Sequence, residues 1–176
     1  MTTIEKETEI RNIVATYALL YWRQLVWQVG QFVPGADEVG LRHQLNDENI
    51  FTHAMEPQEW LEMARYGAGL IDGDAGYIYE ICQGMAEWQF GIADTSAYGI
   101  PDEWKDSPMG ALWWAAYIRV QGDELITIAE AAKLAGVSVQ AMSQRVDRGT
   151  VKAFTDPLSK ERQGRRLVLR SDVVKK

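Results

Sequence analysis

The most informative stretch of the chain is residues 127–149, TIAEAAKLAGVSVQAMSQRVDRG. Its first residue, Thr127, is followed three positions later by Glu130, and this spacing is typical of a capping box at the start of a helix. We therefore expect a helix over residues 128–134. Residues 135–137 should form a tight turn, because the glycine at their centre readily adopts a positive φ.

A second short helix is expected directly after this turn. Ser138 is a residue type preferred at a helix N-cap, and Gly149 suits the left-handed position in which many helices end. Within residues 139–148, Met142 and Val146 are expected to face the core, with polar groups outside. Two short helices joined by a glycine turn indicate a helix-turn-helix.

The residues that follow predict a hairpin and a last short helix. Residues 151–154 and 166–169 have the composition of strands, and the polar segment 155–165 between them suits a hairpin loop. Residues 170–173 are typical of the capped start of a helix. The order of helix, turn, helix, hairpin and helix is a winged arrangement.

Residues 126–173 resemble the winged helix-turn-helix of the excisionase and MerR-like superfamily. The resemblance is carried by Ile128-Ala129-Glu130-Ala131-Ala132, Ala135-Gly136-Val137-Ser138, Arg148-Gly149 and Arg170-Ser171-Asp172-Val173. It covers just under a third of the chain, and the elements have the order and spacing of that superfamily. The resemblance implies that the second helix enters the major groove of double-stranded DNA and that the wing follows the backbone or minor groove.

Two features depart from MerR activators. Those proteins resemble this module at their N-terminus and continue into a dimerising coiled coil, whereas here the module is C-terminal, no coiled coil is expected, and the wing is longer. A MerR-type metal or drug sensor is therefore not supported. Residues 1–122 resemble no family that we can name.

DNA contact requires outward-facing polar and basic side chains. Gln140 and Gln144 suit adenine edges, and Arg148 suits a guanine edge. Arg145 suits a phosphate contact or packing at the helix edge, and Asp147 should point away from DNA. The basic wing is expected to contact phosphates, the alternative being a solvated hairpin tip. The full set of expected DNA contacts is Ser138, Gln140, Ser143, Gln144, Arg145, Arg148, Lys152, Lys160, Arg162, Arg165 and Arg166.

The net charge of −7 argues against a nucleic-acid binder until the chain is divided. Residues 1–122 carry 7 Lys and Arg against 18 Asp and Glu, whereas residues 123–176 carry 11 against 7. This asymmetry suggests two modules with different partners. We therefore predict an acidic, Trp-rich helical domain over residues 1–122, for dimerisation or for binding an effector or partner. A winged helix-turn-helix DNA-binding domain is predicted over residues 123–176.

The first domain is expected to be entirely helical, so the fold class is mainly α with a small two-stranded hairpin wing. The expected helices span residues 4–29, 37–45, 57–65, 77–90 and 111–120, the last of them following a Ser107-Pro108 cap. Residues 98–101 should form a loop. The junction at residues 121–123 is short, which favours packing of the two domains against each other.

All seven tryptophans precede that junction. We expect most of them in the core, with a dimer interface or an aromatic ligand pocket as alternatives. Trp113 and Trp114 are neighbours on one helix and point about 100° apart. We therefore expect one of them to face the core and the other a partner.

Other chemistry has little support in the sequence. His43, His53 and Cys82 do not have the spacing of a zinc site, and no phosphate-binding loop, nucleophile elbow or dinucleotide motif is present. We expect no enzyme activity and no cofactor or metal. One cysteine favours a reducing compartment, residues 1–11 are too polar for a secretory signal, and Arg23 interrupts the apolar stretch 13–29, so a cytoplasmic protein without a membrane span is predicted.

The leading hypothesis is a sequence-specific binder of double-stranded DNA, acting as a transcriptional regulator and as a homodimer through its N-terminal domain. A small-molecule or protein effector is possible in this scheme. The alternatives are an excisionase-like architectural or recombination factor, and a protein-interaction module of antitoxin or phage-adaptor type. The acidic domain could also fold back onto the basic module and restrain DNA binding.

Overall fold

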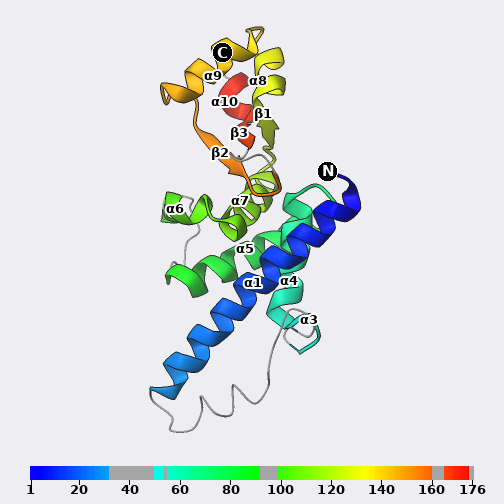
Figure 1. Cartoon of the computed structure of the whole chain (residues 1–176), viewed down its shortest axis with the longest axis vertical. Coiled ribbons are helices and arrows are strands. Elements are labelled where there is room, and N and C mark those ends of the chain that lie inside the picture. Colours follow the sequence, from blue (N-terminus) through cyan, green and yellow to red (C-terminus); the bar gives the residue numbers. More distant parts are fainter. Residues whose placement is uncertain (32–49, 54, 92–98, 160–164, 175–176) are drawn as a thin grey trace. The chain divides into compact units, whose positions relative to one another are not determined.

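The protein is mainly helical, with a small antiparallel sheet near the C-terminus, as the sequence predicts (Figure 1). The structure is a computed structural model and describes residues 1–31, 50–53, 55–91, 99–159 and 165–174. The chain divides into two compact units, Met1–Glu62 and Met63–Lys176. The boundary expected between residues 122 and 123 lies inside the second unit, and the domain roles assigned to its two sides stay predictions.

The first unit contains helix α1 (Thr3–Gly30), helix α3 (Ile50–His53) and the beginning of helix α4 (Met55–Gly67). The long first helix is confirmed to within one residue at each end. Pro57 lies in the first turn of α4, where its missing N–H costs no hydrogen bond. The helix expected over residues 37–45 falls outside the described residues. No helix in the described part of the chain is both long and apolar enough to cross a membrane.

Aromatic contacts hold this unit together. The ring centroids of Tyr17 and Tyr21 lie 5.5 and 5.6 Å from that of Trp60, both edge-on. The Arg11 guanidinium lies 4.3 Å from the centroid of the Phe51 ring. Edge-on ring pairs contribute about 0.5–1.5 kcal/mol each beyond the area that they bury.

Two helices of the second unit begin at capping residues in the local sequence. In helix α5 (Ala75–Phe90), Asp74 caps the first turn, and in helix α7 (Pro108–Val120) Ser107 does so ahead of the proline. The cap of α7 is the one expected from sequence, and α5 begins two residues earlier than expected. The short helix α6 (Asp102–Lys105) was not predicted.

Stacked aromatic rings on α7 form the centre of this unit. Trp113 is fully buried, and its indole N–H donates to the carbonyl oxygen of Cys82 at 2.9 Å. The Trp113 ring stacks on Tyr117 and on Trp114, with centroid distances of 5.2 and 6.2 Å. Because Trp114 is only 7% exposed, the expectation that one of the two adjacent tryptophans faces a partner is wrong. Tyr117 stacks on both rings, and Phe154 lies against Trp114.

The remaining tryptophans divide between core and surface. Trp60 is buried, and Trp22 and Trp104 are half-buried. Trp27 and Trp88 are 64% and 54% exposed. Three of the seven tryptophans are therefore core residues, two are partly buried and two are exposed, so the expectation that most lie in the core is met only in part.

The C-terminal module, residues 123–174, contains the expected helices and hairpin in the expected order. Its elements are β1 (Leu125–Thr127), α8 (Ile128–Leu134), α9 (Val139–Asp147), β2 (Ala153–Asp156), β3 (Arg165–Leu169) and α10 (Arg170–Val174). The sheet has the order β1-β3-β2 and is antiparallel. Strand β1 was not predicted, because three residues are too few for a pattern, and it widens the expected two-stranded wing to three strands.

Register and turns in the module place its apolar side chains on one side. Val168, which pairs with Ala153, is fully buried and packs in one cluster with Ala131, Ala132 and Met142 of the helices. Gly136 and Gly149 have φ of 63° and 71°, which confirms the left-handed turn and helix end. The core cluster consists of Ile126, Ala131, Ala132, Met142, Val151 and Val168.

The C-terminal module packs directly on α7, as the short junction suggests. Helix α7 contacts both β1 and β2. The ring centroids of Trp114 and Phe154 lie 5.6 Å apart, and the Lys105 ammonium lies 4.8 Å from the centroid of Trp114 on the same stack. The C-terminal module is therefore packed against α7 through an aromatic contact and is not loosely tethered to it.

Two glycines provide a test of how closely α6 approaches α7. A Cβ at Gly110 would lie 1.8 Å from the carbonyl oxygen of Trp104, whereas a Cβ at Gly84 would meet nothing within 4 Å. We expect Gly110→Ala to destabilise the protein by about 1–3 kcal/mol through overpacking. Gly84→Ala, inside α5, should stabilise it by up to about 1 kcal/mol. Urea unfolding measures both, and equal effects of the two substitutions would contradict the close approach.

Candidate nucleic-acid interface

Helix α9 presents one side to the core and the other to solvent. Met142 is fully buried in the module's cluster and Val146 packs against it. The Ser138 hydroxyl oxygen caps the helix by accepting from the backbone N–H of Ala141 at 3.1 Å. This bond sets where α9 begins. It also occupies the hydroxyl oxygen of Ser138, a residue that the sequence predicts to contact DNA.

The solvent side of α9 holds most of the predicted base readers. Gln140, Gln144 and Arg148 are spaced by four residues and all are exposed, so they form one row along the helix. Arg145 is also exposed, and Ser143 is half-buried at the edge of the row. The structure thus places four of the predicted helix residues on α9 and the fifth, Arg148, at its C-cap.

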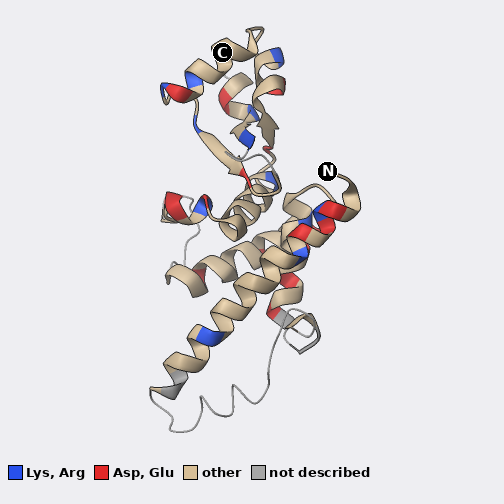
Figure 2. Cartoon of the chain, viewed as in Figure 1, with Lys and Arg blue, Asp and Glu red and all other residues tan. Residues whose placement is uncertain are grey.

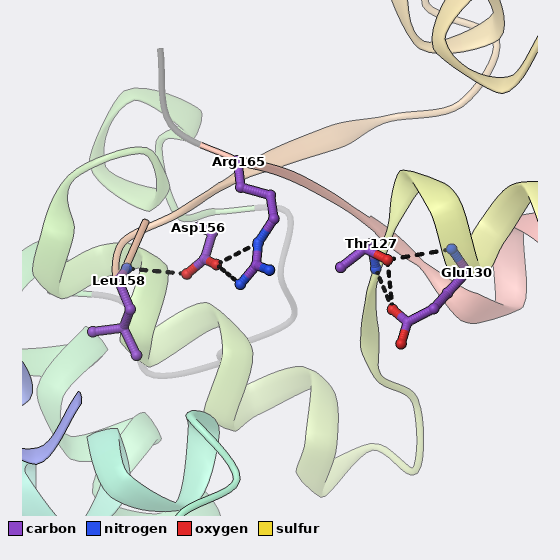
Figure 3. A network of polar contacts seen from close by, with 5 residues as sticks. All are labelled: Thr127, Glu130, Asp156, Leu158 and Arg165. Carbon is purple, nitrogen blue, oxygen red and sulfur yellow. Dashed lines mark hydrogen bonds and ion pairs between the residues drawn. The ribbon is translucent and has the colours of Figure 1, made fainter. Parts of the chain in front are cut away.

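The wing is different, because its cations have acidic partners. Arg165 donates to the carboxylate of Asp156 through Nε at 3.0 Å and Nη2 at 2.7 Å (Figure 3). That carboxylate is 8% exposed and also accepts from the backbone N–H of Leu158 at 3.0 Å. Arg165 therefore closes the hairpin by pairing with the last residue of β2, in addition to any role at the surface.

The other described wing cation is paired in the same way. Arg166 donates to Asp147 at 2.7 Å, joining β3 to the last turn of α9. The pair places Asp147 beside a cation that the sequence assigns to DNA, so the expectation that Asp147 points away from DNA stays a prediction. Lys160 and Arg162 lie outside the described residues.

Lys152, immediately before β2, is held by an acid from a different part of the second unit. Its ammonium lies 3.0 Å from both carboxylate oxygens of Asp102 on α6. The hydrogen bonds from Lys152 and then from Lys105 hold the pKa of Asp102 below its usual value. Fifty residues separate Asp102 from Lys152, so no local pattern in the sequence could reveal the pair.

The cations that remain are concentrated near α9. Among the described residues of the C-terminal module, Lys133, Arg145 and Arg148 have no ion-pair partner within the described part of the chain. In Figure 2, acidic and basic residues are interspersed over this module. The described residues from 123 onward carry seven Lys and Arg against six Asp and Glu. Much of the excess positive charge of residues 123–176 therefore falls outside the described residues.

The capping box at the start of α8 fixes the other half of the helix-turn-helix. The Glu130 carboxylate accepts from the backbone N–H of Thr127 at 2.8 Å and from its hydroxyl at 2.7 Å (Figure 3). The Thr127 hydroxyl oxygen in turn accepts from the backbone N–H of Glu130 at 3.2 Å. The hydrogen bond from the Thr127 hydroxyl is the main cause of a lowered pKa of Glu130, and the bond from the Thr127 backbone N–H is the next.

The described residues contain no candidate metal site and no reactive thiol. No group of three or more His, Cys, Asp and Glu side chains lies together there. Cys82 is fully buried, and burial raises the pKa of its thiol far above the usual value, so the reactive thiolate is disfavoured.

Comparison with known proteins finds no counterpart: no family model matches the chain, and no curated protein or solved structure is significantly similar to it. The resemblance of residues 126–173 to the excisionase and MerR-like superfamily therefore stays a prediction made from the sequence.

Acid titration tests the capping box. Because the pKa of Glu130 is lower in the folded chain than in the unfolded one, its contribution to stability is complete above the unfolded pKa of about 4.3 and is lost as the pH falls through the folded pKa. Glu130→Gln keeps an oxygen acceptor but removes the titrating carboxyl. We expect this variant to lose less free energy of unfolding than the wild type between about pH 6 and pH 3.

Urea unfolding at a series of pH values measures this difference. Glu9→Gln is a suitable control, because Glu9 is exposed on α1 and no described residue hydrogen-bonds its side chain. An acid dependence in Glu130→Gln that matches both the wild type and this control would contradict the role of the capping box.

Proposed function

We propose that the chain binds double-stranded DNA through its C-terminal module, with α9 in the major groove. The observation that supports this most is the exposed row of Gln140, Gln144 and Arg148 on a helix held in place by the buried Met142. Glutamine amides match the N6 and N7 groups of adenine, and an arginine fork matches O6 and N7 of guanine. The major groove is wide enough to admit a helix.

Phosphate contacts are assigned first to α9 and only then to the wing. Arg145 and Arg148 have no acidic partner among the described residues, so they can neutralise phosphates without breaking an ion pair. Arg165 and Arg166 would have to share or exchange Asp156 and Asp147 for phosphate. We therefore propose that Arg165 and Arg166 contribute less to DNA affinity than the number of basic residues in the wing suggests.

We further propose that the chain regulates transcription by binding specific DNA sequences, and that it acts as a homodimer in the cytoplasm. Specific affinity for such a small module usually needs two half-sites, and residues of the N-terminal helices are proposed to supply the dimer contact or to bind an effector. An excisionase-like architectural role is the variant in which the bound site is strongly bent. A DNA-bending assay on the selected site distinguishes the two.

A protein-interaction module is the second candidate function, and one observation favours it. Trp27 on α1 and Trp88 on α5 are 64% and 54% exposed, and tryptophan is enriched in protein interfaces. In this case the acidic helices, and not α9, would be the main functional surface. Such a protein would bind no duplex DNA with sequence preference.

Substitution on the outer row of α9 tests the main proposal. The full chain is used to select bound sites from random duplex DNA, and the selection is repeated with Gln144→Ala. We expect the variant to lose preference at one base position per half-site and to bind the wild-type site more weakly by about 1–3 kcal/mol. Gln28→Ala, an exposed glutamine on α1, is the matched control and should change neither property.

An unchanged base preference in Gln144→Ala would remove this residue from the interface. Failure of the wild type to enrich any duplex, at low and at moderate salt, would argue against DNA binding as a whole and in favour of the protein-interaction module.

The ion pair between Asp102 and Lys152 leads to a separate prediction, in which an acid within the chain competes with phosphate. Asp102→Asn should free Lys152, raise DNA affinity and steepen the dependence of log K on log salt by up to about 0.9. Glu103→Gln removes the same charge from the next residue, which is exposed. Fluorescence anisotropy over a salt series measures both variants, and equal effects would show that net charge alone is responsible.

A further inference from the structure

An apolar side chain lies at the exposed beginning of α9. Val139 is the first residue of the helix and is 52% exposed. A single exposed apolar side chain is common on protein surfaces. Val139 directly precedes Gln140, the first exposed glutamine of the row proposed to face DNA, so it stands at the start of the proposed recognition helix.

Val139 lies on the helix row between the buried side of Met142 and Val146 and the exposed row of Gln140 and Gln144. Val139 and Ser143 are four residues apart, as are Gln140 and Gln144, so the helix carries two neighbouring rows. The β-branched side chain of valine has one strongly preferred rotamer in a helix. Its two methyl groups are therefore held at the N-terminal end of α9, the end from which a recognition helix contacts base edges.

We propose that Val139 recognises the C5 methyl group of a thymine in the major groove, next to the base pair contacted by Gln140. This inference rests on the proposed DNA binding and specifies the base that it requires. The thymine methyl is the apolar group that a base pair presents on its major-groove edge. Valine has no side-chain donor or acceptor, so the amino group of a cytosine in that position would lose water without gaining a partner.

Replacement of thymine by deoxyuridine tests this contact, because it removes one methyl group and leaves base pairing intact. The full chain is titrated against its selected duplex and against duplexes with one thymine changed at a time. We expect uracil at one thymine of each half-site to weaken binding about fourfold, since burial of one methyl group contributes about 0.8 kcal/mol and 1.4 kcal/mol corresponds to tenfold. Val139→Ala should bind the two duplexes equally.

Two further variants control the experiment. Leu134→Ala removes the other exposed apolar side chain near the turn, which is 46% exposed at the end of α8, and should leave the uracil effect unchanged. Val139→Thr keeps the branched shape and one methyl group, and should retain part of the effect. Alanine is tolerated at an exposed position in a helix, and thermal unfolding confirms that each variant is folded.

The outcomes separate this inference from the proposed function. Specific binding that no uracil substitution weakens, or a uracil effect that persists in Val139→Ala, overturns the thymine contact and leaves DNA binding intact. Duplex binding without any base preference has the same consequence. Absence of duplex binding overturns both proposals, and binding of a protein partner that Val139→Ala abolishes would then assign this position to a protein interface.

Discussion

Burial of Met142 beneath the sheet is the constraint on which the C-terminal module depends. Its side chain joins α9 to the alanines of α8 and to Val168 of the central strand. Because Met142 and Val146 both pack in this cluster, α9 keeps that side toward the core. The exposure of Gln140 and Gln144 therefore follows from the packing of Met142, and any chemistry on α9 is set by the core beneath it.

Ion pairs determine how much positive charge the module offers to a partner. Asp156, Asp147 and Asp102 each accept from a cation that the sequence assigned to DNA, and each acid comes from a different element. The pairs made by Asp147 and Asp102 are exposed and add little stability, whereas the Asp156 carboxylate is buried. The larger effect of the pairs is on electrostatics, because a paired cation attracts phosphate less than a free one. The exposed arginines of α9 gain importance by comparison.

Shared aromatic packing explains why the division of the chain differs from the division of its charge. The acidic part and the basic part meet inside the second unit, where Trp114 lies against Phe154. Charge distribution reports the composition of a segment, whereas a structural unit is set by which apolar surfaces are buried together. The charge boundary after residue 122 therefore coincides with a short turn between α7 and β1 and not with a gap between units.

The sequence by itself determined the local elements of this protein. Capping residues such as Thr127, Ser138 and Ser107, and the glycine at 149, act within one helical turn, so their effects can be read from neighbouring residues. Tertiary structure decided the partners of Lys152, Arg165 and Arg166, the short strand β1 and the burial of both adjacent tryptophans. Those features depend on residues far apart in the chain, and a local pattern carries no information about which distant side chain will be brought within hydrogen-bonding distance.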